Sequence, residues 1–309
     1  MGSADDAQLI AVQQALDAAG AASVHVFDPA RLNHGVSLSW DPDHRSGMLA
    51  IDQQRIDLDR IGAVYWRTVA CPPPPSEDDV PERPDDTPDR LDFPSLIIDN
   101  SIAHLQTLQS EAPFRWVNSE RAYRLHRTKA VQLRRVREAG IPTPRTLLTN
   151  HPDDALAFLR TLGACIVKPV RGGDYAQLIH DTDAGRASLR EQLRWMPVTL
   201  QAYVAGHDIR TYVIGHQCHT IRVDATTVDF RLDPAQTVQR WDPPPHVHDW
   251  ALRCARVLEL DWTAIDWRLD ASGQYTFLEA NFSPMFCAVE QATGLPLAHD
   301  LARLLLLVD

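Results

Sequence analysis

The chain has 309 residues, 44% of them hydrophobic and 23% charged, and a formal net charge of −11. This is the composition of a folded globular protein, and the length is sufficient for two compact lobes. A protein that binds nucleic acid non-specifically usually has a basic surface, so the net charge argues against that function. The chain has no apolar run of membrane-spanning length and no signal sequence, and its five cysteines are scattered. These features predict reduced thiols in a cytoplasmic protein without a membrane partner.

The first part of the chain alternates helix and strand signals. We expect a helix over 8–19 and strands over 24–27, 36–40, 47–51 and 61–68. The proline-rich acidic segment 72–94 is expected to form a long loop. A helix over 95–110 and a short strand over 114–117 complete this part. Together these elements predict a small α/β unit.

The remainder of the chain also mixes helices and strands. A long helix is expected over 119–139, because Ser119 is a suitable N-cap and Gly140 ends the pattern. The further expected elements are a helix over 151–162, strands over 164–170, 198–203, 208–214 and 219–224, a helix over 250–258, a hairpin over 264–281 and a helix over 296–307. This order predicts an α/β (α+β) fold.

Only two of the 30 Lys and Arg residues are lysines, Lys129 and Lys168. Lysine is a compact charge that meets a phosphate end-on, whereas arginine is a wide planar fork, so these two positions are candidates for a role that arginine would not fill. Lys129 falls on the apolar face of the helix expected over 119–139. An unpaired buried ammonium is costly, so we expect an anion beside it, from the protein or from a ligand. The alternatives are two lysines retained by chance, or a Lys129 whose ammonium reaches water at the helix rim.

Lys168 ends an apolar strand and precedes a glycine-rich turn. The strand stops at Pro169, which cannot donate to a ladder. Gly172 and Gly173 allow a ligand to approach the backbone closely, and Arg171 adds a second cation. A strand, a lysine and a glycine-rich turn in this order indicate a polyphosphate site. The segment is not a P-loop, because no Gly-Lys-Ser/Thr occurs in it.

The hairpin near the C-terminus carries polar residues on what should be one face of two paired strands. If residues 272–273 form a two-residue loop, Asp266 lies directly opposite Glu279 and Arg268 lies opposite Phe277. Two carboxylates in this position repel each other, so a cation must hold them.

Asn281 lies one step from Glu279 on the same face and completes a set of oxygen donors with Asp266. Such a set suits Mg²⁺, which also recruits nucleotide phosphates. Arg268 lies two residues from Asp266 and is expected to bind a phosphoryl or acyl-phosphate group. The alternative is a surface hairpin in which Arg268 simply pairs with one of the acids.

These elements, in this order, resemble the ATP-grasp superfamily. The resemblance implies that ATP and Mg²⁺ are the cofactors. Its implied nucleotide-binding residues are Lys129, Lys168, Arg171, Gly172 and Gly173 for the phosphates, Gln201, Ala202, Tyr203 and Val204 for adenine, and Asp208 for ribose. Its implied metal ligands are Asp266, Glu279 and Asn281.

Within this superfamily the chain most resembles the graspetide ligases, the microviridin-type peptide macrocyclases. The segments that carry the likeness are Val64–Arg67, Trp116–Ser119, Thr143–Asn150 and Asp229–Arg231. The resemblance implies three parts: an N-terminal domain over 1–117, a central lid domain over 118–200 and a C-terminal lobe over 201–309. RimK-like ligases are relatives of the same group.

The resemblance also implies an activity. Graspetide ligases phosphorylate an Asp or Glu side chain of a ribosomal precursor peptide, and a Ser, Thr or Lys side chain then closes an ester or amide ring. The expected partner is therefore a precursor peptide with acidic and Ser, Thr or Lys residues, and a homodimer is possible. We expect Arg268, with Arg222 and Arg231, to hold the acyl phosphate.

Two departures from the family pattern leave other functions open. Ala202 stands where the hinge usually has Glu, and Phe282–Phe286 replaces a Pro-Gly run. One alternative is a RimK-like ligase that joins a free amino acid or small carboxylic acid to an amine; another is a nucleotide-binding scaffold without catalysis. A metal site at His246 and His248 is a further hypothesis, against which a solvated loop is favoured.

Overall fold

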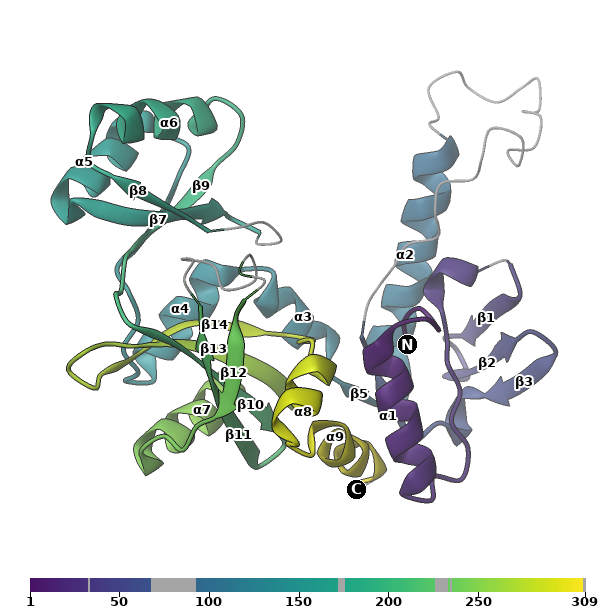
Figure 1. The fold of residues 1–309 in the computed structure, drawn as a ribbon. Helices are drawn as coiled ribbons and strands as arrows, with labels where there is room; N and C mark the ends of the chain where they lie inside the picture. The colour runs from purple at the N-terminus through teal and green to yellow at the C-terminus, as the bar shows by residue number, and fades with distance from the viewer. Residues whose placement is uncertain (33, 68–92, 172–175, 226–232, 234, 308–309) are drawn as a thin grey trace. The chain divides into compact units, whose positions relative to one another are not determined.

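The computed structural model describes residues 1–309 except 33, 68–92, 172–175, 226–232, 234 and 308–309, and it leaves out the side chains of 93, 94 and 97. The chain divides into two compact units (Figure 1). Unit 1 comprises Met1–Glu120, Met285–Cys287 and Pro296–Asp309, and unit 2 comprises Arg121–Pro284 and Ala288–Leu295. The predicted division at 117/118 and 200/201 is a finer one, and it stays a prediction. Among the described residues, no helix combines the length and apolar character needed to cross a membrane.

Unit 1 is built from two small sheets and three longer helices. Its elements are α1 (Ala7–Ala18), the short 3-10 helices η1 (Pro29–Arg31) and η2 (Leu58–Arg60), β1 (Val36–Asp41), β2 (Ser46–Ile51), β3 (Gln54–Asp57), β4 (Ala63–Tyr65), α2 (Phe93–Glu111), β5 (Arg115–Val117) and α9 (Leu297–Leu306). Strands β1, β2 and β3 form an antiparallel meander, and β4 pairs with β5 in parallel. The helix α9 packs against α1 and β4 through a buried apolar face (Figure 1).

One predicted strand of unit 1 does not form. Residues 24–27 have no strand partner, although the Phe27 carbonyl accepts a hydrogen bond from Gly2 N at 2.9 Å. A β-type residue run is not sufficient for a strand, because a strand also needs a neighbour that offers a complete ladder. The elements predicted over 8–19, 36–40, 47–51 and 95–110 are present in the structure with small shifts of their ends.

Unit 2 contains a four-stranded antiparallel sheet with two helices on one face. Its elements are β6 (Thr146–Thr149), α5 (Pro152–Leu162), β7 (Ala164–Pro169), β8 (Gln177–His180), α6 (Asp183–Leu193) and β9 (Val198–Ala202), and the strand order is β6-β9-β7-β8. Proline at the first helical position and Asp153 and Asp154 in the first turn favour the start of α5, and Gly163, with φ of 72°, ends it. Side chains of both helices pack on inward residues of the strands to form the core of this sheet.

Unit 2 also contains a five-stranded antiparallel sheet in the order β12-β11-β10-β13-β14. The strands are β10 (His207–Ile214), β11 (Gln217–Asp224), β12 (Thr237–Arg240), β13 (Trp262–Leu269) and β14 (Tyr275–Asn281), and the nearby helices are α3 (Glu120–His126), α4 (Lys129–Glu138), α7 (Pro245–Val257) and α8 (Cys287–Thr293). Helix α7 contacts four of the strands, so it covers one face of the sheet (Figure 1). Helix α4 packs against the edge strand β14.

The single helix predicted over 119–139 is wrong, because the structure has α3 and α4 with a break between them. The break lies at Thr128, whose hydroxyl donates to the carbonyls of Arg124 and Leu125 at 3.3 and 3.1 Å. A threonine competes for backbone groups in this way and favours a helix boundary. The predicted C-terminal end is confirmed: Gly140, with φ of 80°, donates to the Arg137 carbonyl in a Schellman arrangement.

Candidate functional site

The two carboxylates of the predicted hairpin lie opposite each other on β13 and β14. Asp266 and Glu279 are direct cross-strand partners, as the sequence predicted. Asn281 lies next on the same face, and its Nδ2 donates to Asp266 Oδ2 at 3.0 Å. The three side chains predicted to bind metal are thus brought together on one face of the five-stranded sheet.

The predicted position of Arg268 opposite Phe277 is wrong. A bulge follows the Asp266–Glu279 pair, so Trp267 pairs with Phe277 and Arg268 with Thr276. The connecting turn is also longer than two residues, because Asp270 N donates to the Gln274 carbonyl at 3.1 Å. The bulge moves Phe277 to the apolar face of the sheet. There its ring packs edge-to-face against that of Trp267, with the two ring centres 5.8 Å apart.

Arg210 is a member of the site to which sequence reasoning assigned no role. It lies opposite Asp266 on the neighbouring strand β10 and holds it with two hydrogen bonds, Nε to Oδ1 at 2.6 Å and Nη2 to Oδ2 at 2.9 Å. Burial alone would lower the pKa of Arg210, but the Asp266 carboxylate outweighs it and raises the pKa. The available signal was the spacing of Asp208 and Arg210, which places both on one face of a strand.

Arg268 pairs with Asp208 in this structure. The two are cross-strand partners, with Arg268 Nη1 3.0 Å from Asp208 Oδ2 and 3.0 Å from the Gly206 carbonyl. Asp208 and Arg210 on β10 therefore face Arg268 and Asp266 on β13, in two opposite-charge pairs. The alternative in which Arg268 pairs with one of the two hairpin acids is wrong, because its partner is Asp208 on β10.

Both lysines act on Glu279. Lys129 Nζ lies 3.3 Å from Glu279 Oε2, and the two side chains are 11% and 30% exposed. Lys168 Nζ donates to Gln201 Oε1 at 3.2 Å. Burial alone would raise the pKa of Glu279, but the charges of Lys129 and Lys168 outweigh it and lower the pKa to about 2. The expected anion beside Lys129 is therefore a protein carboxylate in this structure.

The structure does not bring Arg222 together with Asp266. Strand pairing puts Arg222 beside Ile209, and Ile209 beside Trp267, so Arg222 lies on the face that α7 covers. There its Nε donates to Asp224 at 2.7 Å and its guanidinium lies 5.7 Å from the centre of the Trp241 ring. Of the other predicted residues, Gly172, Gly173 and Arg231 lie outside the described residues, and Arg171 is exposed.

The predicted adenine-binding residues lie at the end of β9 and just beyond it. Gln201 is buried and its Nε2 donates to Thr146 Oγ1 at 3.2 Å. Ala202 is the last residue of β9, and Tyr203 and Val204 follow it. A pocket of about 490 Å³ is lined by residues 203–206 and by the turn at 270–272. Two of the predicted hinge residues, Tyr203 and Val204, therefore line this pocket.

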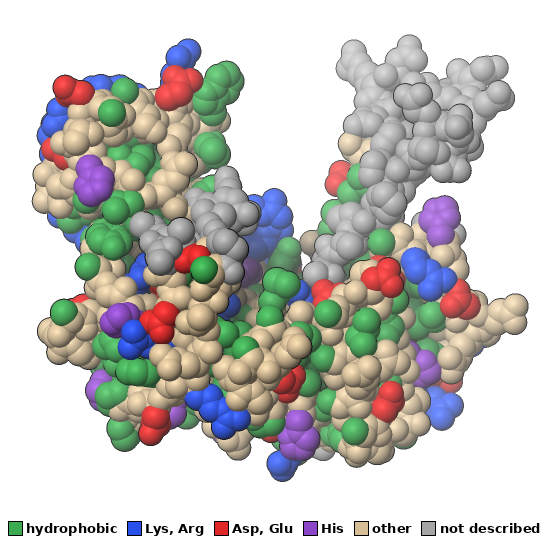
Figure 2. Space-filling model, viewed as in Figure 1, with side chains coloured by type: hydrophobic (Ala, Val, Ile, Leu, Met, Phe, Trp, Pro, Cys, Tyr) green, Lys and Arg blue, Asp and Glu red, His purple; other side chains and the backbone are tan. Residues whose placement is uncertain are grey.

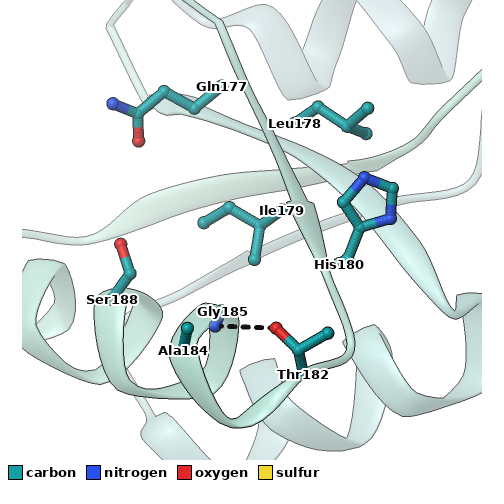
Figure 3. Close-up of a pocket in the computed structure, with 8 residues that line it drawn as sticks. All are labelled: Gln177, Leu178, Ile179, His180, Thr182, Ala184, Gly185 and Ser188. Carbon is teal, nitrogen blue, oxygen red and sulfur yellow. Dashed lines mark hydrogen bonds between the residues drawn. The ribbon is translucent and has the colours of Figure 1, made fainter.

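A second pocket, of about 540 Å³, lies between the edge strand β8 and α6 (Figure 3). Two of the residues that line this pocket are hydrogen-bonded to each other: Thr182 Oγ1 accepts from Gly185 N at 3.2 Å (Figure 3). None of the described residues predicted to bind ATP or metal lines this pocket. The hypothesis of a metal site at His246 and His248 is a separate one, and both residues lie in the first turn of α7 rather than in a loop. His248 Nε2 lies 3.4 Å from Thr220 Oγ1. Among the described residues, no group of three or more His, Cys, Asp or Glu side chains could hold a metal ion.

Comparison with known proteins shows the family of this chain. Residues 126–305 match the model of the RimK-like ATP-grasp domain. A structure of the ATP-grasp ligase PsnB complexed with a minimal precursor is 28% identical, covers 98% of this chain and 96% of that one, and has a TM-score of 0.81. No curated protein matches the chain in the sequence comparison.

Two further structures share the fold at lower identity. The macrocyclase MdnC from Microcystis aeruginosa MRC, bound with precursor peptide MdnA, is 19% identical over 99% of this chain and 97% of that one, with a TM-score of 0.82. A ligase from Chryseobacterium gregarium, associated with ribosomal peptide products and complexed with ADP and a leader and core peptide, is 16% identical over 99% and 94%, with a TM-score of 0.81. The predicted fold class is confirmed, and the chain belongs to the RimK-like ATP-grasp family.

Proposed function

We propose that the protein is an ATP-dependent ligase that activates an Asp or Glu side chain of a ribosomal precursor peptide as an acyl phosphate and then closes an ester or amide ring. The observation that carries the proposal is the cluster of Asp266, Glu279 and Asn281 with Lys129 beside it and Lys168 within electrostatic reach. The likeness to PsnB supports it, since that ligase has been seen with its precursor and, in another structure, with Mg and ADP as well.

The side chains of Asp266, Glu279 and Asn281 are of the type that binds Mg²⁺. Two carboxylates and one amide oxygen are hard oxygen ligands, and Mg²⁺ commonly completes its shell with water and phosphate oxygens. When bound, Mg²⁺ would supply positive charge beside the ATP phosphates. Asn281 would then have to present its oxygen rather than its Nδ2, which now donates to Asp266. Asp266, Glu279 and Asn281 are the residues that would hold the ion.

The proposed chemistry needs no protein nucleophile. A substrate carboxylate oxygen attacks the γ-phosphorus of ATP, the bond from that phosphorus to the β-phosphate oxygen breaks, and ADP leaves. A hydroxyl or amine of the same peptide then attacks the acyl carbon, loses its proton, and expels phosphate. Lys129 and Lys168 would neutralise the phosphates, and Arg268, released from Asp208, would hold the acyl phosphate.

The alternative function is a RimK-like ligase that joins a free amino acid or small carboxylic acid to an amine, and the match to the RimK-like ATP-grasp domain keeps it as a candidate. We therefore propose measuring ADP release with Mg²⁺ and ATP on two substrate pools. One pool holds acidic ribosomal peptides encoded beside the gene, followed by intact mass, and the other holds free amino acids and small carboxylic acids. ADP release with loss of one water per ring supports the macrocyclase, whereas ADP release with the second pool alone supports a RimK-like ligase.

Two variants test the site itself. Lys168→Ala and Glu279→Ala should each lower ADP release by about 100-fold, because the first removes a positive charge beside the phosphates and the second removes a carboxylate that would hold Mg²⁺. Arg134→Ala is the control, since Arg134 forms an exposed pair with Glu138 on the same helix as Lys129. Binding and turnover of ATP at the wild-type rate in both site variants would refute the proposed function.

A further inference from the structure

The strand that carries Glu279 and Asn281 is an edge strand, and side chains of a neighbouring helix complete its hydrogen bonding. Strand β14 ends the five-stranded sheet, so in the described part of the chain one side of its backbone has no neighbouring strand. Ala280, between the two predicted ligands, directs its N–H and its carbonyl to that side. Gln132 Nε2 donates to the Ala280 carbonyl at 3.1 Å, and Ala280 N donates to Gln132 Oε1 at 3.3 Å. Gln132 is 1% exposed, so one buried amide satisfies both backbone groups of Ala280, while Phe277 N donates to the Pro142 carbonyl at 2.9 Å.

His126 adds a further contact to the same carbonyl. Its Nδ1 lies 3.2 Å from the Ala280 oxygen, and its ring lies 6.1 Å from that of Phe282 at a tilted angle. Lys129, three residues before Gln132 on α4, contacts Glu279. The same helix face therefore holds both the ammonium that pairs with Glu279 and the amide that fixes the next peptide unit.

We propose that Gln132, supported by His126, is a positioning residue for the metal site. Glu279 and Asn281 flank Ala280 by one residue on either side, so a displaced Ala280 peptide moves both ligands away from Asp266. Fixing that peptide to α4 also sets the distance from Lys129 to the ligands. This inference rests on the proposed function, because it assigns Gln132 to the site where Mg²⁺ and ATP would bind.

The competing explanation is that Gln132 only stabilises the edge of the sheet. The two explanations differ in metal affinity, because a residue that orients ligands typically changes metal affinity by 10–100-fold when it is lost. Arg135 offers a matched control on the same helix. It donates to the Val257 carbonyl at 3.0 Å and to Glu259 at 3.2 Å, and among the described residues it makes no hydrogen bond or ion pair with β14.

The experiment measures Mn²⁺ binding by electron paramagnetic resonance at saturating ADP, with thermal unfolding recorded for each protein. Gln132→Met keeps the length of the side chain and removes both hydrogen bonds. We expect it to weaken Mn²⁺ binding by about 10–100-fold. Arg135→Met should lower the unfolding temperature as well, but leave the Mn²⁺ affinity within about threefold of wild type.

His126→Phe serves if Gln132→Met does not fold, because it keeps the ring against Phe282 and removes one contact to Ala280. It should weaken Mn²⁺ binding by roughly threefold to tenfold. Wild-type Mn²⁺ affinity in the folded variants overturns the positioning role and leaves the proposed function intact. Failure of the wild-type protein to bind Mn²⁺ with ADP would instead overturn the proposed function, and the metal role of Gln132 with it.

Discussion

At the scale of single residues, the site is held by opposite charges that the protein supplies itself. Arg210 holds Asp266, Lys129 holds Glu279, and Arg268 holds Asp208. Carboxylates on neighbouring strands repel each other, and here each has a cation of its own. The site therefore holds its acids in place through contacts within the protein.

The Lys129–Glu279 pair gives a prediction about pH. The pKa of Glu279 is lowered from 4.5 to about 2 in the folded protein, so its contribution to stability is present above pH 4.5 and lost as the pH falls toward 2. Lys129→Met should lower the free energy of unfolding by about 2 kcal/mol at pH 7, the value typical of a hydrogen bond to a charged group. The difference from wild type should shrink steadily between pH 5 and pH 3.

Urea unfolding at several pH values measures this difference. Arg134→Met is the control on the same helix, because its pair with Glu138 is exposed and should contribute about 0.5 kcal/mol or less. A loss of stability in Lys129→Met that stays constant from pH 7 to pH 3 would show that packing, and not charge, is what the lysine supplies.

At the scale of elements, the start of β10 depends on a backbone position that only glycine fits. Gly206 has φ of 145°, and a Cβ on it would lie 2.1 Å from the Leu269 carbonyl oxygen. The same residue's carbonyl accepts from Arg268. The turn at Gly206 therefore packs closely against the end of β13. This contact fixes where β10 begins to pair with β13, close to the Asp208–Arg268 pair.

We predict that Gly206→Ala lowers the free energy of unfolding by about 3 kcal/mol, since it adds a clash to backbone strain. Gly273→Ala is the matched control. It also has positive φ, 85°, but nothing lies within 4 Å of its Cβ position, so it should cost only about 1 kcal/mol. Equal losses in the two variants, measured by urea unfolding, would contradict the close approach.

Two elements show where sequence patterns fail. Hydrophobic periodicity continues across Thr128, so the pattern predicts one helix, whereas the hydroxyl bonds of Thr128 mark a break that places Lys129 at the start of α4. The alternation in β14 likewise gives no sign of the bulge that separates the Glu279 pair from the Phe277 pair. Both features depend on which backbone groups find partners, and a local pattern does not contain that information.

At the scale of the whole molecule, every described residue assigned to ATP or metal lies in unit 2. The two lysines, the hinge residues and the ligands fall between 121 and 284. Unit 1 has its own sheets and helices, and its C-terminal helix α9 returns to α1 and β4. Unit 1 therefore contains the first and last elements of the chain, and unit 2 contains the candidate site.

We predict that Mg²⁺ with ADP slows amide hydrogen exchange in unit 2 and leaves β1, β2 and β3 of unit 1 unchanged. Ligand binding stabilises the part of a protein that holds the ligand, and local opening there becomes rarer. Exchange followed by mass spectrometry locates the effect by segment, with Glu279→Ala as the control that should show little protection. Protection confined to β1, β2 and β3 would place the nucleotide site elsewhere.

The sequence by itself determined the fold class and most helices and strands, because alternating burial and turn residues are local properties of the chain. It also predicted the opposition of Asp266 and Glu279, but that pair forms because the bulge in β14 offsets a turn longer than the predicted one. It also singled out Lys129 and Lys168 by their rarity. Tertiary structure alone decided that Arg210 holds Asp266, that Arg268 faces Asp208, that Arg222 lies on the opposite face, and that Gln132 completes β14. The contacts of Arg210, Arg268 and Gln132 join residues from 56 to 148 positions apart, and strand register and helix packing, which no local pattern records, bring them together.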